Sequence, residues 1–92
     1  MPRIKINKKR FQAVKSFLSA HPEVKKISEY TQCLDEEAYG ITRVDGETLL
    51  QDSYLGAIPI KLGDFIAVGT DGTTFKVTPV YNETNEITNF VI

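Results

Sequence analysis

Between residues 8 and 20, apolar side chains recur at intervals that place them on one side of a helix. Asn7 is a residue type that accepts hydrogen bonds from the amides of a first helical turn, so it is expected to cap this helix. His21-Pro22 is expected to end it, because the residue before a proline avoids the helical conformation. The pattern predicts a helix from Lys8 to about Ala20, with one apolar stripe made of Phe11, Val14, Phe17 and Leu18.

Extended patterns flank this helix. Residues 3–6 alternate polar and apolar side chains and predict a short strand. Residues 24–32 have apolar positions three apart, as in a helix, but their Val, Ile, Tyr and Thr favour a strand, which is our prediction. Residues 39–44 and 47–51 predict a hairpin turning at Asp45-Gly46, with Ile41 opposite Leu50.

A second hairpin is predicted around Asp71-Gly72, between extended segments at 64–69 and 74–78. A two-residue turn there would pair Val68 with Phe75 and Ile66 with Val77, all on one buried face. The opposite face carries Phe65 and Ala67 and is expected to be partly covered.

The remaining segments complete an α+β domain. Residues 52–60 are expected to form a loop with a short extended stretch at 57–58, and the apolar residues of 80–92 are expected to dock as a final strand or turn. A chain of 92 residues builds one core, so residues 1–92 are predicted to form a single domain. The predicted fold is one N-terminal helix packed on a small, mainly antiparallel sheet of about five or six short strands.

The chemistry-bearing residues are sparse. Cys33 is the sole cysteine and His21 the sole histidine, too few for a zinc site made from nitrogen and sulfur ligands. Cys33 is expected to be a packed small side chain, and His21 a surface residue at the helix end. The single cysteine and the lack of a signal-peptide or membrane-spanning pattern predict a soluble, cytoplasmic protein with no membrane partner.

The acidic side chains suggest no catalytic pair. Asp45 and Asp71 are explained as turn residues, and residues 35–37 form a solvated acidic connection. The six glycines are scattered singly, without the spacing of a phosphate-binding loop. We therefore expect no enzymatic activity, no catalytic residue, no metal site and no cofactor.

Basic residues are concentrated at the start of the chain. Residues 1–26 contain eight Lys and Arg against one acid, whereas residues 27–92 contain three against eleven acids. Basic residues in a first helical turn oppose the helix dipole, which costs a few tenths of a kcal/mol per charge and points to a possible functional role. Either this basic segment binds a partner or nucleic acid, or the acidic strands neutralise it within the fold. The candidate contact residues are Arg3, Lys5, Lys8, Lys9 and Arg10.

One segment resembles a known family. Residues 62–69, with Gly72, Phe75 and Tyr81 further on, are similar to small uncharacterised phage and prophage proteins that carry a Pro-Gly-Asp-Trp-Ile motif. Here Leu62 replaces the proline and Phe65 the tryptophan. The resemblance covers less than half of the chain, in its C-terminal part, and implies a phage origin without assigning an activity.

The sequence therefore predicts a phage- or prophage-derived accessory protein in a bacterial cytoplasm, which acts by contact with a host or phage protein. The alternative is a nucleic-acid-associated protein that uses the basic N-terminal helix.

Overall fold

The computed structural model describes residues 8–92, and over this range the α+β prediction is confirmed. Helix α1 spans Lys8–Ala20, a short 3-10 helix η1 spans Glu37–Tyr39, and the strands number seven rather than five or six. The strand predicted at residues 3–6 and the cap at Asn7 lie outside the described residues. The strands are β1 (Val24–Glu29), β2 (Ile41–Val44), β3 (Glu47–Asp52), β4 (Gly56–Pro59), β5 (Phe65–Gly69), β6 (Thr74–Tyr81) and β7 (Ile87–Val91).

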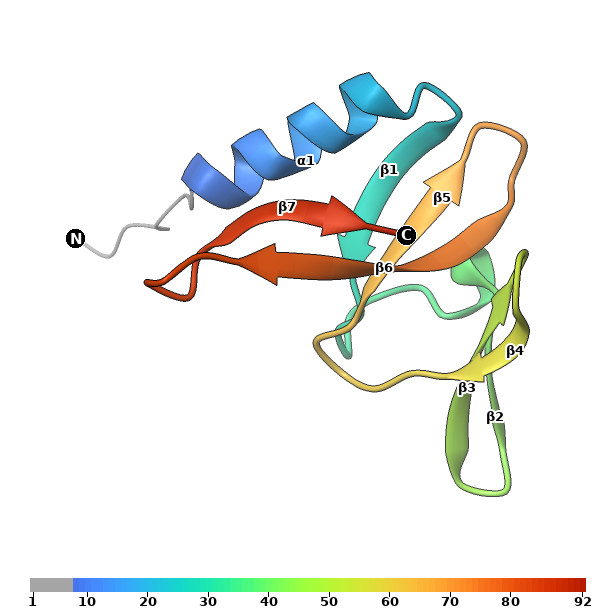
Figure 1. Ribbon diagram of the computed structural model, residues 1–92. Helices are drawn as coiled ribbons and strands as arrows, with labels where there is room; N and C mark the ends of the chain where they lie inside the picture. The colour runs from blue at the N-terminus through green and yellow to red at the C-terminus, as the bar shows by residue number, and fades with distance from the viewer. Residues whose placement is uncertain (1–7) are drawn as a thin grey trace.

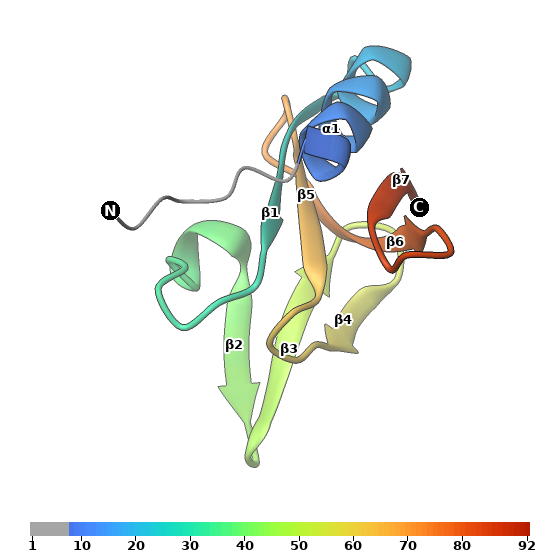
Figure 2. The ribbon, with the colours of Figure 1, turned by 90° about the vertical axis from the view of Figure 1, so that its left-hand side faces the viewer.

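The strands form two sheets rather than the single sheet that was predicted. A four-stranded sheet has the order β1-β5-β6-β7, a three-stranded sheet has the order β2-β3-β4, and all neighbours are antiparallel. Helix α1 packs along β7 and also contacts β1. Figures 1 and 2 both show the β2–β3 hairpin projecting from the end of the molecule opposite this helix.

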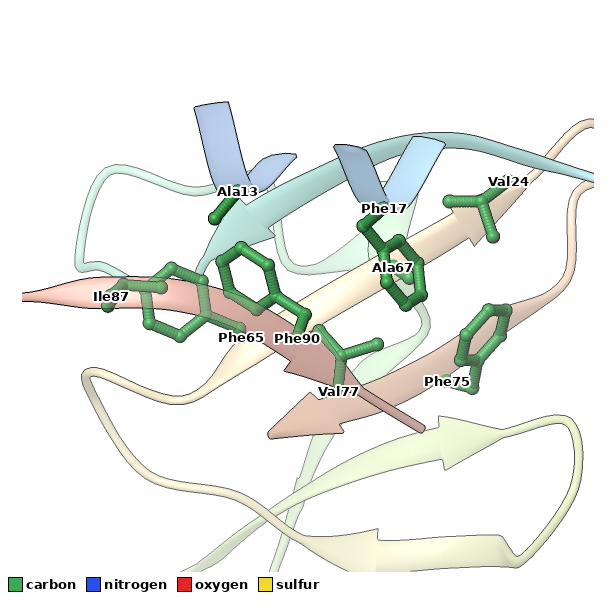
Figure 3. Packing of buried hydrophobic residues seen from close by; sticks show 9 residues of the cluster. All are labelled: Ala13, Phe17, Val24, Phe65, Ala67, Phe75, Val77, Ile87 and Phe90. Atoms are coloured by element: carbon green, nitrogen blue, oxygen red, sulfur yellow. The ribbon is translucent and has the colours of Figure 1, made fainter. Parts of the chain in front are cut away.

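Strand β5 lies between two hydrophobic clusters and contributes side chains to both. Phe65 and Ala67 face the cluster under α1, which Figure 3 shows, while Ile66 belongs to the second cluster, beside the smaller sheet. All three side chains are at most 4% exposed, so β5 is covered on both faces. The first cluster contains Ala13, Phe17, Val24, Phe65, Ala67, Phe75, Val77, Ile87 and Phe90, and the second contains Tyr30, Tyr39, Ile41, Leu50, Ile60 and Ile66.

The β5–β6 hairpin has a different register from the predicted one. Ala67 pairs with Phe75 and Val68 with Thr74, one residue away from the expected pairing. The reason lies in the loop, which has three residues: the amide of Gly69 donates to the carbonyl of Thr73 (2.7 Å) and the amide of Gly72 to the carbonyl of Gly69 (3.1 Å). Both favoured two-residue turns need positive φ at their first central residue, which would be Asp71, but of this pair only Gly72 has it (86°).

The hairpin predicted at Asp45-Gly46 is confirmed by strands β2 and β3. Asp45 and Gly46 have φ of 52° and 82°, as a two-residue turn requires, and Ile41 pairs with Leu50. The strand interpretation of the region after the helix is confirmed by β1, and the final strand by β7.

The loop predicted at residues 52–60 is instead mostly strand. After a tight turn at 53–55, β4 returns along β3, with Leu50 opposite Ile58. Pro59 occupies the last position of this edge strand, where the missing amide hydrogen does not interrupt the ladder.

Helix α1 has the predicted bounds, but the side of the helix that is buried differs from the predicted one. Ala13 and Phe17 are each 2% exposed, with Val14 and Leu18 packed beside them, whereas Phe11 is 55% exposed. The prediction that Phe11 belongs to the buried stripe is therefore wrong, because the stripe is centred on Ala13 and Phe17, positions that let the helix approach β7 closely.

Candidate interaction surfaces

The predicted basic contact residues are only partly within the described chain. Arg3 and Lys5 lie outside it, and Lys8 and Lys9 are described only as backbone in the first turn of α1. Arg10 is half-buried: its Nη2 lies 3.0 Å from Oε1 of Glu29, and its guanidinium lies 5.0 Å from the centroid of the Phe65 ring. Arg10 thus fastens the helix to β1 and β5.

Phe11 and Lys15 lie on the solvent-facing side of the same helix. The Lys15 ammonium nitrogen is 5.2 Å from the centroid of the Phe11 ring, and both side chains are exposed. A cation at this distance from a ring is held by the charge distribution of the ring. Among the described residues, no carboxylate forms an ion pair with Lys15.

A buried polar junction joins the end of β3 to the start of β6. The carboxylate of Asp52, only 3% exposed, accepts hydrogen bonds from the amides of Tyr54 (2.7 Å), Leu55 (3.0 Å) and Lys76 (2.9 Å). Thr74 adds a hydroxyl hydrogen bond of 2.7 Å to the carbonyl of Gln51. A buried carboxylate is costly unless it is satisfied in this way, so the junction fixes the turn that follows Asp52.

The fixed turn presents two large apolar side chains to solvent. Tyr54 is 65% exposed and Leu55 is 73% exposed. The centroid of the Tyr54 ring lies 5.1 Å from that of the Phe75 ring. Tyr54, Leu55 and Ile92 all border a hollow of about 220 Å³. We call Tyr54, Leu55 and Ile92 the apolar turn surface.

Sequence reasoning missed this surface because it treated residues 52–60 as a loop. Its signal was present: Asp52 is a residue type that accepts hydrogen bonds from amides two and three positions ahead, and Gly56 supplies the positive φ (80°) that ends the turn. Two large apolar residues between such positions stand at the tip of a constrained turn.

An open, mainly polar groove lies beside the projecting β2–β3 hairpin. Its volume is about 770 Å³, and its walls include Tyr30, Glu36, Arg43 and Leu62. Oε1 of Glu36 accepts hydrogen bonds of 3.4 Å from both Tyr30 Oη and Arg43 Nη2. The Tyr30 hydroxyl and the Glu36 carboxylate raise the pKa of the Arg43 guanidinium above its ordinary value. Glu36 thus binds the side chains of both Tyr30 and Arg43 within this groove.

Tyr39 lies between two polar side chains of β1. Its hydroxyl is 2.8 Å from Ser28 Oγ, and the Lys26 ammonium is 5.0 Å from the centroid of its ring. Burial alone would raise the pKa of the Tyr39 hydroxyl, but the Lys26 ammonium and the Ser28 hydroxyl outweigh burial and lower the pKa below its ordinary value. These contacts hold η1 against β1.

The remaining chemistry-bearing residues occupy other places than predicted. Cys33 is exposed, so the prediction of a packed cysteine is wrong. His21 is half-buried rather than a plain surface residue: its ring stacks on Phe17, 4.2 Å between centroids, and Nδ1 lies 3.1 Å from the carbonyl oxygen of Phe17. Over residues 8–92, no group of three or more His, Cys, Asp or Glu side chains is placed to hold a metal ion.

Comparison with known proteins assigns no family: no family model, no curated protein and no solved structure matches this chain. In the described part of the chain, no helix has the length and apolar character needed to cross a membrane.

Proposed function

We propose that this chain is a non-catalytic accessory domain of phage or prophage origin that binds a host or phage protein through the apolar turn surface. The observation that carries the proposal is the exposure of Tyr54 (65%) and Leu55 (73%) on a turn whose amides are held by the buried carboxylate of Asp52.

The rigidity of the turn matters more than its exposure. Single exposed apolar residues are common on soluble proteins and need no partner. Here two neighbouring large side chains, with Ile92 beside them, are held on a backbone that is already ordered. A surface that loses little conformational freedom on binding gives more affinity for the same contact area, and tyrosine is enriched among residues that dominate protein interfaces.

The phage origin rests on the motif resemblance and not on this surface. Within the motif, Phe65 is 4% exposed and packs in the first cluster, while Gly63 has a φ of 96° in the turn before β5. Residues with such roles maintain an architecture, so the resemblance supports common descent and a bacterial cytoplasmic setting. It contributes no residue to the binding surface.

The proposal is tested by photo-crosslinking in the cell that carries the gene. A photoreactive phenylalanine analogue placed at Tyr54 is expected to capture one predominant protein, identified by mass spectrometry. Placed at Val44, which is 51% exposed at the distant tip of the β2–β3 hairpin, the same analogue is the matched control and is expected not to capture it.

A Leu55→Asp change in the same chain is expected to abolish the adduct at position 54 without altering thermal stability, because Leu55 is mostly outside the core. Identical adduct patterns from positions 54 and 44 would reject the apolar turn surface as a binding site.

A further inference from the structure

A second exposed surface is formed by helix α1. Phe11 and Lys15 lie one helical turn apart and form one exposed aromatic and cationic pair. Phe11 is 55% exposed, and Lys15 has no carboxylate partner among the described residues.

Uncharged polar groups border this pair. Gln12 and Ser16, each the next residue after Phe11 and Lys15, line a shallow hollow of about 290 Å³ together with Thr88 of β7. The side chains of Gln12 and Ser16 carry donors that can bind phosphate or sugar oxygens. The exposed side of α1 thus offers one aromatic ring, one ammonium without an ion-pair partner among the described residues, and several neutral donors.

We propose that this face of α1 binds single-stranded nucleic acid, with a base stacked on Phe11 and the neighbouring phosphate bound by Lys15. Single strands are bound without sequence preference by aromatic rings on which bases stack, combined with cations that follow the backbone. The Lys15 nitrogen lies over the Phe11 ring, 5.2 Å from its centroid. A base that stacks on this face displaces the ammonium, which stays within reach of the neighbouring phosphate.

The chemistry favours a nucleic acid over an acidic protein. A protein partner would need a wider apolar area than a single ring, since interface cores are apolar and well packed. The exposed neighbours of Phe11 are instead Gln12, Lys15 and Ser16, which suit a polyanion with flat faces. The β1 carboxylate Glu29 is paired with Arg10 at 3.0 Å, and among the described residues no ion pair involves Lys15.

Fluorescence anisotropy with labelled oligouridylate and oligothymidylate of about 20 nucleotides tests the proposal. The affinity is measured at salt concentrations of roughly 50 to 200 mM, a range over which the loss of a phosphate contact changes the salt dependence. We expect Phe11→Ala to weaken binding about 5- to 140-fold, the range for losing one stacked base. Lys15→Gln is expected to reduce the slope of log affinity against log salt by about 0.7, the value for one phosphate of a single strand.

Two variants and one competitor make the outcome decisive. Lys61→Gln removes the same charge from an exposed lysine elsewhere and is expected to leave the salt slope unchanged. Phe11→Leu keeps an apolar side chain without the ring and is expected to bind as weakly as Phe11→Ala. The proposal is overturned if no binding is detected at low salt, if Lys15→Gln and Lys61→Gln behave alike, or if polyglutamate competes as well as the oligonucleotide.

Discussion

At the scale of single residues, buried polar groups in this chain position backbone rather than perform chemistry. Asp52 organises three amides, and Tyr39 ties η1 to β1 through Ser28 and Lys26. Neither role can be predicted from the pattern of polar and apolar residues. An aspartate in a solvated loop and an aspartate that accepts hydrogen bonds from the amides of a turn occupy the same kind of position in that pattern.

Replacing Asp52 by Ala is expected to destabilise the fold by about 2–4 kcal/mol, since three partly buried amides lose their acceptor. Asp52→Asn keeps one acceptor oxygen and is expected to lose less. Chemical denaturation measures both, and a loss below about 1 kcal/mol for Asp52→Ala would show that the junction does not hold the turn.

Tyr39 gives a prediction about pH. Its pKa is lower in the folded protein than in the unfolded chain, so its ionisation stabilises the fold at pH values above the unfolded pKa, and this contribution is lost as the pH falls through the folded pKa. Lys26→Met is expected to move the phenolate absorbance titration of Tyr39 to higher pH. Lys25→Met, a neighbouring exposed lysine, is the control, and an equal titration in both variants would contradict the assignment.

At the scale of elements, the sequence predicted those helices and turns that are determined by neighbouring residues in the chain. The helix bounds follow from apolar periodicity and Pro22, and the β2–β3 hairpin from Asp45-Gly46. The β5–β6 register could not be predicted, since Asp-Gly suits both a two-residue turn and the last two positions of a three-residue loop. The choice is fixed by Asp71, whose carboxylate accepts from the Thr73 amide (3.1 Å) and hydroxyl (2.7 Å).

The three-residue loop makes Gly72 the only residue of its turn with positive φ (86°). Gly72→Ala meets no atom within 4 Å, so its cost is conformational, about 1–2 kcal/mol. Gly72→Asn is expected to cost less, because asparagine tolerates this conformation. Thermal unfolding of the two variants measures the difference, and equal stability of Gly72→Ala and the parent would contradict the loop geometry.

At the scale of the whole molecule, two clusters share β5, and two exposed surfaces lie outside them. The length of the sequence predicted one core but not its division into two clusters, which depends on how β4 returns to β3 and on the register of β5. Of the candidate site residues, Arg10 was predicted as a contact and is engaged with Glu29. The apolar turn surface and the Phe11–Lys15 pair emerged only from the tertiary structure.

Binding of a protein by the apolar turn surface is measured by calorimetry with the purified partner captured at position 54. Leu55→Asp is expected to raise the dissociation constant at least about tenfold, which corresponds to roughly 1.4 kcal/mol, while Val44→Asp leaves it unchanged. Equal dissociation constants for Leu55→Asp and the unaltered chain would contradict the account.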